Sequence, residues 1–180
     1  MIKIYFSKLN NPQKHSNGFK KKVLSKVLNI GESDLSIKED LFGKPYIDSF
    51  PHIHFNISHS KRFIACGVSD SIIGIDIEDI KPLKEKIVEK FYTLPEKEYI
   101  YSSPNRQNKR FIEIWTKREA YAKGLGLGLV MPFDFFNVLE DERIRTIYIE
   151  DWILSVFSQD DELHTNLELF RLENFKQENF

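Results

Sequence analysis

Two carboxylates in one short segment are the first candidates for chemistry. The segment Gly74-Ile75-Asp76-Ile77-Glu78 alternates apolar and acidic residues, so in a strand the isoleucines share one face and Asp76 and Glu78 share the other. Carboxylates held this close repel one another unless a cation or protons lie between them. Oxygen ligands with no cysteine nearby favour a hard ion, Mg2+ first. An acidic strand face that simply meets solvent is the alternative interpretation.

A second candidate lies on a helix that the apolar spacing predicts over residues 109–123. Trp115, Glu119 and Lys123 are four residues apart and therefore form one stripe on that helix. The stripe aligns an aromatic ring, a carboxylate and an ammonium group. Taken alone, it is also explained by an ordinary Glu–Lys pair on a helix surface, which contributes only about 0.3–0.5 kcal/mol.

A third candidate is the polar segment Asn56-Ile57-Ser58-His59-Ser60, between two predicted strands. The hydroxyl of Ser58, the imidazole of His59 and nearby backbone N–H groups could hold a phosphate. Adjacent residues rarely point at each other, so a Ser–His nucleophile pair is disfavoured. His52 and His54 share a strand face, but no cysteine or further ligand at standard spacing supports a zinc site.

Basic residues crowd the first thirty positions, although the whole chain has a formal net charge of −1. A local basic patch on a nearly neutral protein suits a phosphorylated small ligand better than a nucleic-acid backbone. Nucleic-acid binding is further disfavoured because no aromatic residues are interleaved with these lysines. A solvated face of a helix is the alternative. The residues are Lys14, Lys20, Lys21, Lys22 and Lys26.

The elements that must position these groups alternate without a regular βαβ order, which favours an α+β fold in two similar halves, residues 1–70 and 71–180. Apolar spacing predicts helices over 17–29, within 82–101 and over 109–123. The glycine-rich segment 124–129 is expected to end the last helix and lead into a strand, because phosphate-binding loops precede a helix. Strands are predicted over 2–6, 35–38, 54–58, 62–68, 72–78, 133–139, 145–149, 152–157 and 164–172.

Composition indicates an ordinary globular protein. Of 180 residues, 41% are hydrophobic, which is enough for one large core or two small ones packed together. No apolar run reaches the ~20 residues needed to cross a membrane, and no signal-peptide pattern is present. The single cysteine, Cys66, excludes an internal disulfide and is expected to be a small buried hydrophobe. We therefore expect a cytoplasmic protein without membrane contact.

Taken together and in this order, the motifs resemble those of the Sfp-type 4'-phosphopantetheinyl transferases. That family has a Gly-Ile/Val-Asp-Ile/Val-Glu strand followed, some forty residues later, by a Trp-Ser/Thr-x-Lys-Glu-x-x-x-Lys helix. The corresponding segments are 74–78 and 115–123, and the upstream segments 43–45 and 58–60 match the family's Gly-Lys-Pro and Ser-His-Ser. The likeness covers roughly residues 40 to 130. Arg118 departs from it, because the family usually has Lys there.

The resemblance implies a pseudo-dimer of two α+β halves with coenzyme A bound in the cleft between them, acting as a monomer. It implies transfer of 4'-phosphopantetheine from coenzyme A to a serine of an acyl or peptidyl carrier protein. By position, Mg2+ would be held by Asp76, Glu78 and Glu119. The 3'-phosphate end of coenzyme A would lie against Lys44, Ser58 and His59, with Lys123 over the pyrophosphate. Glu119 is the best candidate base, and Lys20 is matched to a basic residue of the family that reaches the ligand's phosphates.

Two other functions are compatible with the same residues. One is a module of this fold that binds coenzyme A or a nucleotide without transfer, and the other is a metal-dependent phosphohydrolase. The carrier protein is expected to dock on the segment from Pro82 to Asn108, which joins the two main motifs. This segment offers Lys84, Lys86 and Lys90 to an acidic partner. Ile87 and Phe91, four residues apart, could contact the partner or pack on the core.

Overall fold

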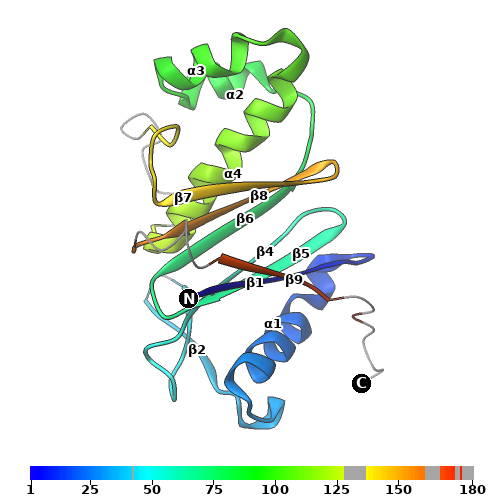
Figure 1. The fold of residues 1–180 in the computed structure, drawn as a ribbon, viewed down its shortest axis with the longest axis vertical. Coiled ribbons are helices and arrows are strands. Elements are labelled where there is room, and N and C mark those ends of the chain that lie inside the picture. Colours follow the sequence, from blue (N-terminus) through cyan, green and yellow to red (C-terminus); the bar gives the residue numbers. More distant parts are fainter. Residues whose placement is uncertain (42, 128–136, 161–166, 173–174, 176–180) are drawn as a thin grey trace.

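The computed structural model describes residues 1–41, 43–127, 137–160, 167–172 and 175. Its elements form four layers, with helix α1 on one outer face, two β-sheets in the middle, and helices α2 to α4 on the other outer face (Figure 1). The fold is therefore mixed α+β, as the sequence predicts. None of the described helices has the length and apolar character that crossing a bilayer demands.

The first sheet has four strands in the order β4-β5-β1-β9, namely β4 (His54–His59), β5 (Phe63–Ser69), β1 (Ile2–Lys8) and β9 (Leu167–Arg171). The first three strands pair antiparallel, whereas β9 pairs parallel to β1, with Ile2 opposite Leu167. Helix α1 (Pro12–Leu28) packs its apolar side chains on one face of this sheet. Cys66 is fully buried in that contact, which confirms its expected role as a core residue.

The second sheet has three antiparallel strands in the order β6-β8-β7: β6 (Ile73–Asp79), β8 (Trp152–Ser158) and β7 (Ile144–Ile149). One face packs against the first sheet, and alternation along β6 sends Ile73, Ile75 and Ile77 into that shared core. The other face is covered by α4 (Gln107–Leu125), with α2 (Glu85–Phe91) and α3 (Leu94–Tyr101) beyond it. Asp76 and Glu78 therefore face the helical side.

The remaining elements are short. Strands β2 (Ile37–Glu39) and β3 (Pro45–Ile47) form a hairpin, and two 3-10 helices span Glu32–Asp34 and Pro104–Arg106. Gly43, at the turn of the hairpin, has φ 78°, a left-handed conformation that favours glycine. The hairpin leads into β4 and brings Lys44 towards the last turn of α4.

Most predicted elements are present with shifted ends. Helix α1 begins at Pro12, five residues before the predicted start, and ends at Asn29 in a left-handed cap rather than at Gly31. Helix α4 ends at Gly126, whose φ of 70° confirms the predicted helix stop. The strand expected over 133–139 lies largely outside the described residues, and residues 137–139 have no regular structure. The strand expected over 164–172 is described from Leu167 onwards.

Candidate active site

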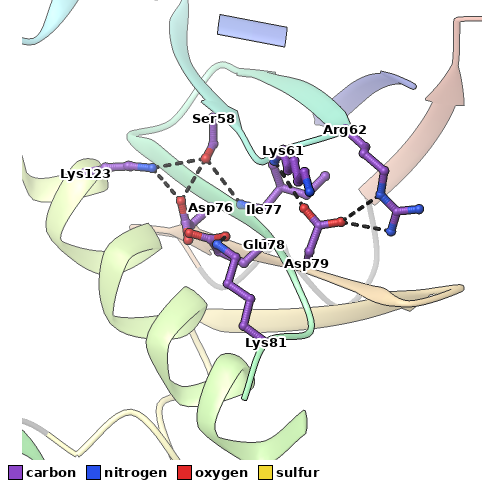
Figure 2. Close-up of polar contacts among 9 residues, drawn as sticks. All are labelled: Ser58, Lys61, Arg62, Asp76, Ile77, Glu78, Asp79, Lys81 and Lys123. Carbon is purple, nitrogen blue, oxygen red and sulfur yellow. Dashed lines mark hydrogen bonds and ion pairs between the residues drawn. The ribbon is translucent and has the colours of Figure 1, made fainter. Parts of the chain in front are cut away.

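The side chain of Asp76 lies at the point where β6, β4 and α4 meet, and only 5% of its surface is exposed. Its Oδ1 atom accepts a hydrogen bond from Ser58 Oγ at 2.7 Å and another from Lys123 Nζ at 2.6 Å (Figure 2). Its Oδ2 atom is buried and has no hydrogen-bond partner among the described residues. A buried carboxylate oxygen without a partner is costly, so the site favours a ligand at Oδ2.

Ser58 links the two sheets through one hydroxyl. While its hydrogen goes to Asp76, its oxygen accepts from Lys123 Nζ at 3.1 Å and from the backbone N–H of Ile77 at 3.3 Å. One donor and two acceptor positions are all that a hydroxyl has. Two residues earlier on β4, the side chain of Asn56 accepts from the N–H of Ile75 at 3.0 Å. Side chains of β4 thus satisfy the free edge of β6 and fix the position of Asp76.

Two glycines allow α4 to lie directly on β6. A Cβ atom at Gly74 would stand 2.0 Å from the carbonyl oxygen of Ala120 and 2.3 Å from the backbone nitrogen of Gly124. A Cβ atom at Gly124 would meet the ring of Phe157 at 2.3 Å. Both distances are far below van der Waals contact, so neither position accepts a side chain without movement of the helix. This close approach places Lys123 within reach of Asp76.

Glu78 and Glu119 complete the acidic group from β6 and α4. Burial raises the pKa of both carboxyl groups above the ordinary glutamate value, and the negative charge of Asp76 raises each further. The ammonium of Lys81, 2.5 Å from Glu78, partly offsets the shift of Glu78, and Lys123 does so for Glu119. Repulsion from the carboxylate of Glu78 also raises the pKa of Glu119. The three carboxylates are thus close enough to interact electrostatically.

The donor set of this site fits a hard divalent ion, because it offers carboxylate oxygens and one of them, Asp76 Oδ2, is buried and unpartnered. With their side chains as they stand, the described residues include no group of three or more His, Cys, Asp or Glu that could hold a metal ion. Lysine ammonium groups already contact two of the three carboxylates, since Lys123 pairs with Asp76 and Lys81 pairs with Glu78. The carboxylate oxygens therefore suit a divalent ion chemically. For the ion to bind, Lys123 and Lys81 must share or release the oxygens of Asp76 and Glu78.

The other predicted site residues lie at different distances from this group. Lys44 is half-buried at the last turn of α4, where its Nζ donates to the carbonyl oxygen of Gly124, and burial lowers its pKa. His59 ends β4 directly after Ser58, and its side chain is exposed. Lys20 is not brought to the site. It lies on α1, which packs on the face of the first sheet that points away from the second sheet.

Sequence reasoning missed a second polar link between the sheets, at the end of β6. Asp79 accepts from the backbone N–H of Lys61 at 3.1 Å and from Nε and Nη2 of Arg62 at 3.1 and 3.0 Å (Figure 2). Arg62 also pairs with Asp151 at 2.5 Å. The available signal was Asp79, the acidic residue directly after the Asp-x-Glu motif. Its partner Arg62 is 17 residues away, however, and nothing in the spacing identifies this partner.

A small cavity opens beside Glu78, with a volume of about 100 Å3. Its lining combines apolar side chains with Glu78 and two lysines. These residues come from the end of β6, the segment that follows it, α2 and α4, and they are Glu78, Lys81, Lys84, Ile87, Phe111, Ile112 and Trp115. The cavity therefore connects the acidic group to the segment that the sequence offers as a docking surface.

Comparisons with known proteins identify relatives of the chain. A family model described as the 4'-phosphopantetheinyl transferase superfamily matches residues 72–173. The 4'-phosphopantetheinyl transferase gsp of Aneurinibacillus migulanus is 37% identical over 131 residues, 71% of this chain and 54% of that protein. The 4'-phosphopantetheinyl transferase Sfp of Bacillus subtilis (strain 168) is 35% identical over 117 residues, 64% of this chain and 52% of that protein.

A third relative, named 4'-phosphopantetheinyl transferase, comes from Bacillus subtilis and is 36% identical over 129 residues, 71% of this chain and 58% of that protein. The chain thus spans a little over half the length of each of these relatives. The part matched by the family model contains β6, α4 and the carboxylates that they carry.

Proposed function

The chain belongs to the 4'-phosphopantetheinyl transferase superfamily, and from this membership we propose that it transfers the 4'-phosphopantetheine moiety of coenzyme A to a serine of an apo carrier protein, releasing 3',5'-ADP. The three relatives described above all carry the name of this enzyme. No observation favours a binding module without transfer or a phosphohydrolase.

The observation that best supports the proposal is the environment of Asp76. Asp76 has one carboxylate oxygen that is buried and unpartnered among the described residues and another held by Lys123 and Ser58, and its charge raises the pKa of both Glu78 and Glu119. Such a group is unfavourable in an isolated protein and becomes favourable when cationic and phosphate groups of a ligand complex enter it.

The proposed metal ligands are Asp76, Glu78 and Glu119. A bound Mg2+ would neutralise charge on the pyrophosphate of coenzyme A, which is what attack by a hydroxyl on a phosphoryl group most requires. The protein's own contribution is to fix the carboxylates on two rigid elements, the strand β6 and the helix α4, held together through Gly74 and Gly124.

The remaining roles follow from charge and position. Lys123 carries a positive charge at the site and would contact the pyrophosphate and the departing 3',5'-ADP. Glu119 would take the proton of the attacking serine, directly or through a water. Without a bound cation, burial and the charge of Asp76 raise the pKa of Glu119, so its carboxylate is a stronger base than that of an exposed glutamate.

The 3'-phosphate of coenzyme A would be held by Lys44, Ser58 and His59. Ser58 and His59 end the same strand, and Lys44 reaches the last turn of α4, which carries Lys123. Since the hydroxyl of Ser58 is already committed to three partners, its phosphate contact would require one of them to be released. The predicted contact of Lys20 with the phosphates of coenzyme A stays a prediction, and it requires the bound ligand to reach α1.

The pseudo-dimer is supported by the layers, since each sheet carries helices on its outer face and packs its inner face on the other. The proposed cleft is the junction of β4 with β6 and α4. The division into residues 1–70 and 71–180 also stays a prediction, and β9 would then be exchanged into the sheet of the first half. A cytoplasmic location and a monomeric state remain predictions as well.

Mass spectrometry of apo carrier proteins tests the proposal. Several acyl and peptidyl carriers are incubated with the protein, coenzyme A and Mg2+, and the expected result is a mass gain of one phosphopantetheine on at least one of them. Release of free phosphopantetheine without a carrier would instead indicate a phosphohydrolase. Coenzyme A binding without modification of any carrier would indicate a binding module.

A further inference from the structure

We propose that Lys123 is a tethered counter-ion of Asp76 that competes with the divalent cation for this carboxylate, so that one side chain links cation binding to phosphate binding. The proposal deepens the proposed function, because it rests on Asp76 being a metal ligand. It assigns to Lys123 a role before the substrate arrives, in addition to its contact with the pyrophosphate.

The contacts of Lys123 support this role. Its Nζ atom lies 2.6 Å from Asp76 Oδ1 and 3.1 Å from Ser58 Oγ, so it is held by an ion pair and a hydrogen bond at once. The side chain of Asp76 is 7% exposed and that of Lys123 is 31% exposed. A charge-assisted contact with a buried carboxylate is stronger than one at an open surface.

Lys123 contacts the oxygen of Asp76 that lies beside the one left open for a cation. Ser58 and Lys123 both donate to Oδ1 of Asp76, whereas Oδ2 is buried and unpartnered among the described residues. A divalent ion that arrives at Asp76 therefore places a second positive charge beside the ammonium. Like charges at this separation repel, so the ion binds tightly only when Nζ moves away.

Phosphate is the natural destination for the released ammonium. Lys123 is on the last turn of α4, and its ammonium stands at the end of a flexible four-carbon stem. Rotation about the bonds of this stem can therefore move Nζ from Asp76 to a phosphate beside it. A ligand phosphate that takes Lys123 then raises the affinity for the cation, and the cation raises the affinity for the ligand by the same factor.

Isothermal titration with MgCl2, at constant ionic strength and without coenzyme A, tests the competition. Lys123→Met keeps the length of the side chain and removes its charge, and Mg2+ should bind this variant on the order of tenfold more tightly than wild type, as expected for loss of a ~1.4 kcal/mol competitor. Lys123→Arg keeps the charge and should stay close to wild type. Melting curves establish that each variant is folded, and Lys123→Gln replaces the Met variant if it is not.

Lys44→Met is the matched control for long-range electrostatics. It removes a half-buried ammonium at the same end of α4, but one that donates to the carbonyl of Gly124 instead of a carboxylate. Its Mg2+ affinity should stay within about twofold of wild type, because no competitor is removed. An equal gain in Lys44→Met and Lys123→Met would show a general effect of charge and would overturn the proposal.

A second titration, with saturating coenzyme A, measures the linkage. Coenzyme A should raise the Mg2+ affinity of wild type by a larger factor than that of Lys123→Met, because the variant has no ammonium to release. Unchanged or weaker Mg2+ binding in Lys123→Met overturns the counter-ion role, even if wild type modifies carriers. Tighter binding in the variant together with no transfer by wild type would instead refute the proposed function and leave the counter-ion role in place.

Discussion

The carboxyl groups of Glu78 and Glu119 are ionised at a cost, because burial and the neighbouring Asp76 raise their pKa in the folded protein. The folded state therefore binds protons more readily than the unfolded state. Below the unfolded pKa both states are protonated and stability is unaffected. As the pH rises through the unfolded and then the folded pKa, the free energy of unfolding falls.

Glu119→Gln should remove part of this penalty. In buffer without divalent ions, we expect its free energy of unfolding at pH 7 to exceed that of wild type by about 0.5–2 kcal/mol, with little difference near pH ~3. Urea unfolding at both pH values measures the effect. An equal gain at both would show that packing, not charge, is responsible.

The same group of carboxylates should be indispensable for transfer. Asp76→Ala or Glu119→Ala is expected to reduce carrier modification nearly to zero while circular dichroism shows an intact fold, since each removes a proposed ligand of Mg2+. Adding Mg2+ should raise the melting temperature of wild type more than that of either variant. Turnover near wild type in both variants would remove the metal assignment.

Lys44 and His59 allow a test of how coenzyme A is oriented. If they hold the 3'-phosphate, Lys44→Ala and His59→Ala should each weaken coenzyme A about ten- to a hundredfold, the loss expected for a charge-assisted contact. Dephospho-coenzyme A lacks that phosphate and should bind all three proteins alike. Equal losses for both ligands would place these residues at another part of the molecule.

At the scale of elements, the contact between α4 and β6 depends on glycine at two positions. Gly124→Ala introduces a methyl group where the ring of Phe157 already lies, so it should lower stability by about 1–3 kcal/mol despite the higher helix propensity of alanine. It should also weaken Mg2+ binding, because Lys123 and Glu119 move with the helix.

Gly18→Ala is the matched control for this effect. Gly18 is also in a helix, but a Cβ atom there would meet only the ring of Phe175, at an ordinary 3.8 Å. The substitution should therefore be neutral or raise stability by up to ~1 kcal/mol. Thermal melts of both variants give the comparison, and similar losses in the two would argue against a steric cause.

Arg118 joins three helices through a buried ion pair. Its guanidinium donates to both carboxylate oxygens of Glu96 and to the carbonyl of Phe91, and it is 1% exposed. Glu96 in turn forms the capping box of α3 with Thr93. The departure from the family's usual lysine therefore has a structural explanation, because only a planar fork makes these contacts together.

Arg118→Lys should consequently lower the free energy of unfolding, by about 1–3 kcal/mol, because one buried carboxylate oxygen and one carbonyl lose their donors. Lys117→Arg is the control, since Lys117 contacts Glu113 at 3.3 Å through an ion pair that arginine can also make. Urea unfolding of both variants measures the free energy of unfolding. If Arg118→Lys leaves it unchanged, lysine can satisfy the same groups.

How far the sequence predicts these elements depends on the signal that each carries. Alternation identified β6 and placed Asp76 and Glu78 opposite the isoleucines, and spacing by four aligned Glu119 with Lys123 on α4. The first turn of α1 was missed because residues 13 to 17 are polar and carry no apolar period. Contacts between distant segments, such as Ser58 with Asp76, leave no trace in local spacing.

At the scale of the whole molecule, the carrier protein needs a surface beside the acidic group. Lys86 and Lys90 are exposed on α2, which also lines the cavity next to Glu78. Ile87 packs against the helical core, so its structural role is confirmed, whereas Phe91 is 39% exposed, with the ammonium of Lys90 5.0 Å from the centroid of its ring. These features are compatible with docking of an acidic partner on α2.

Reversing the two lysines tests this surface. Lys86→Glu with Lys90→Glu should raise the KM for the carrier severalfold and reduce its dependence on salt, because rim charges act mainly on association. Coenzyme A affinity should not change. The control for total charge is Lys14→Glu with Lys21→Glu, because both lysines are exposed on α1. Equal weakening in the two double variants would show that the carrier docks elsewhere.

The parallel pairing of β9 with β1 has a consequence for synthesis. Ile2 lies opposite Leu167, so β1 acquires this neighbour only after some 165 further residues have been translated. Until then one edge of β1 is an unsatisfied template, open to other nascent chains. Contacts so distant in sequence also slow folding, because a long loop must close before they form. A chaperone that shields β1 during translation would therefore raise the yield of native protein.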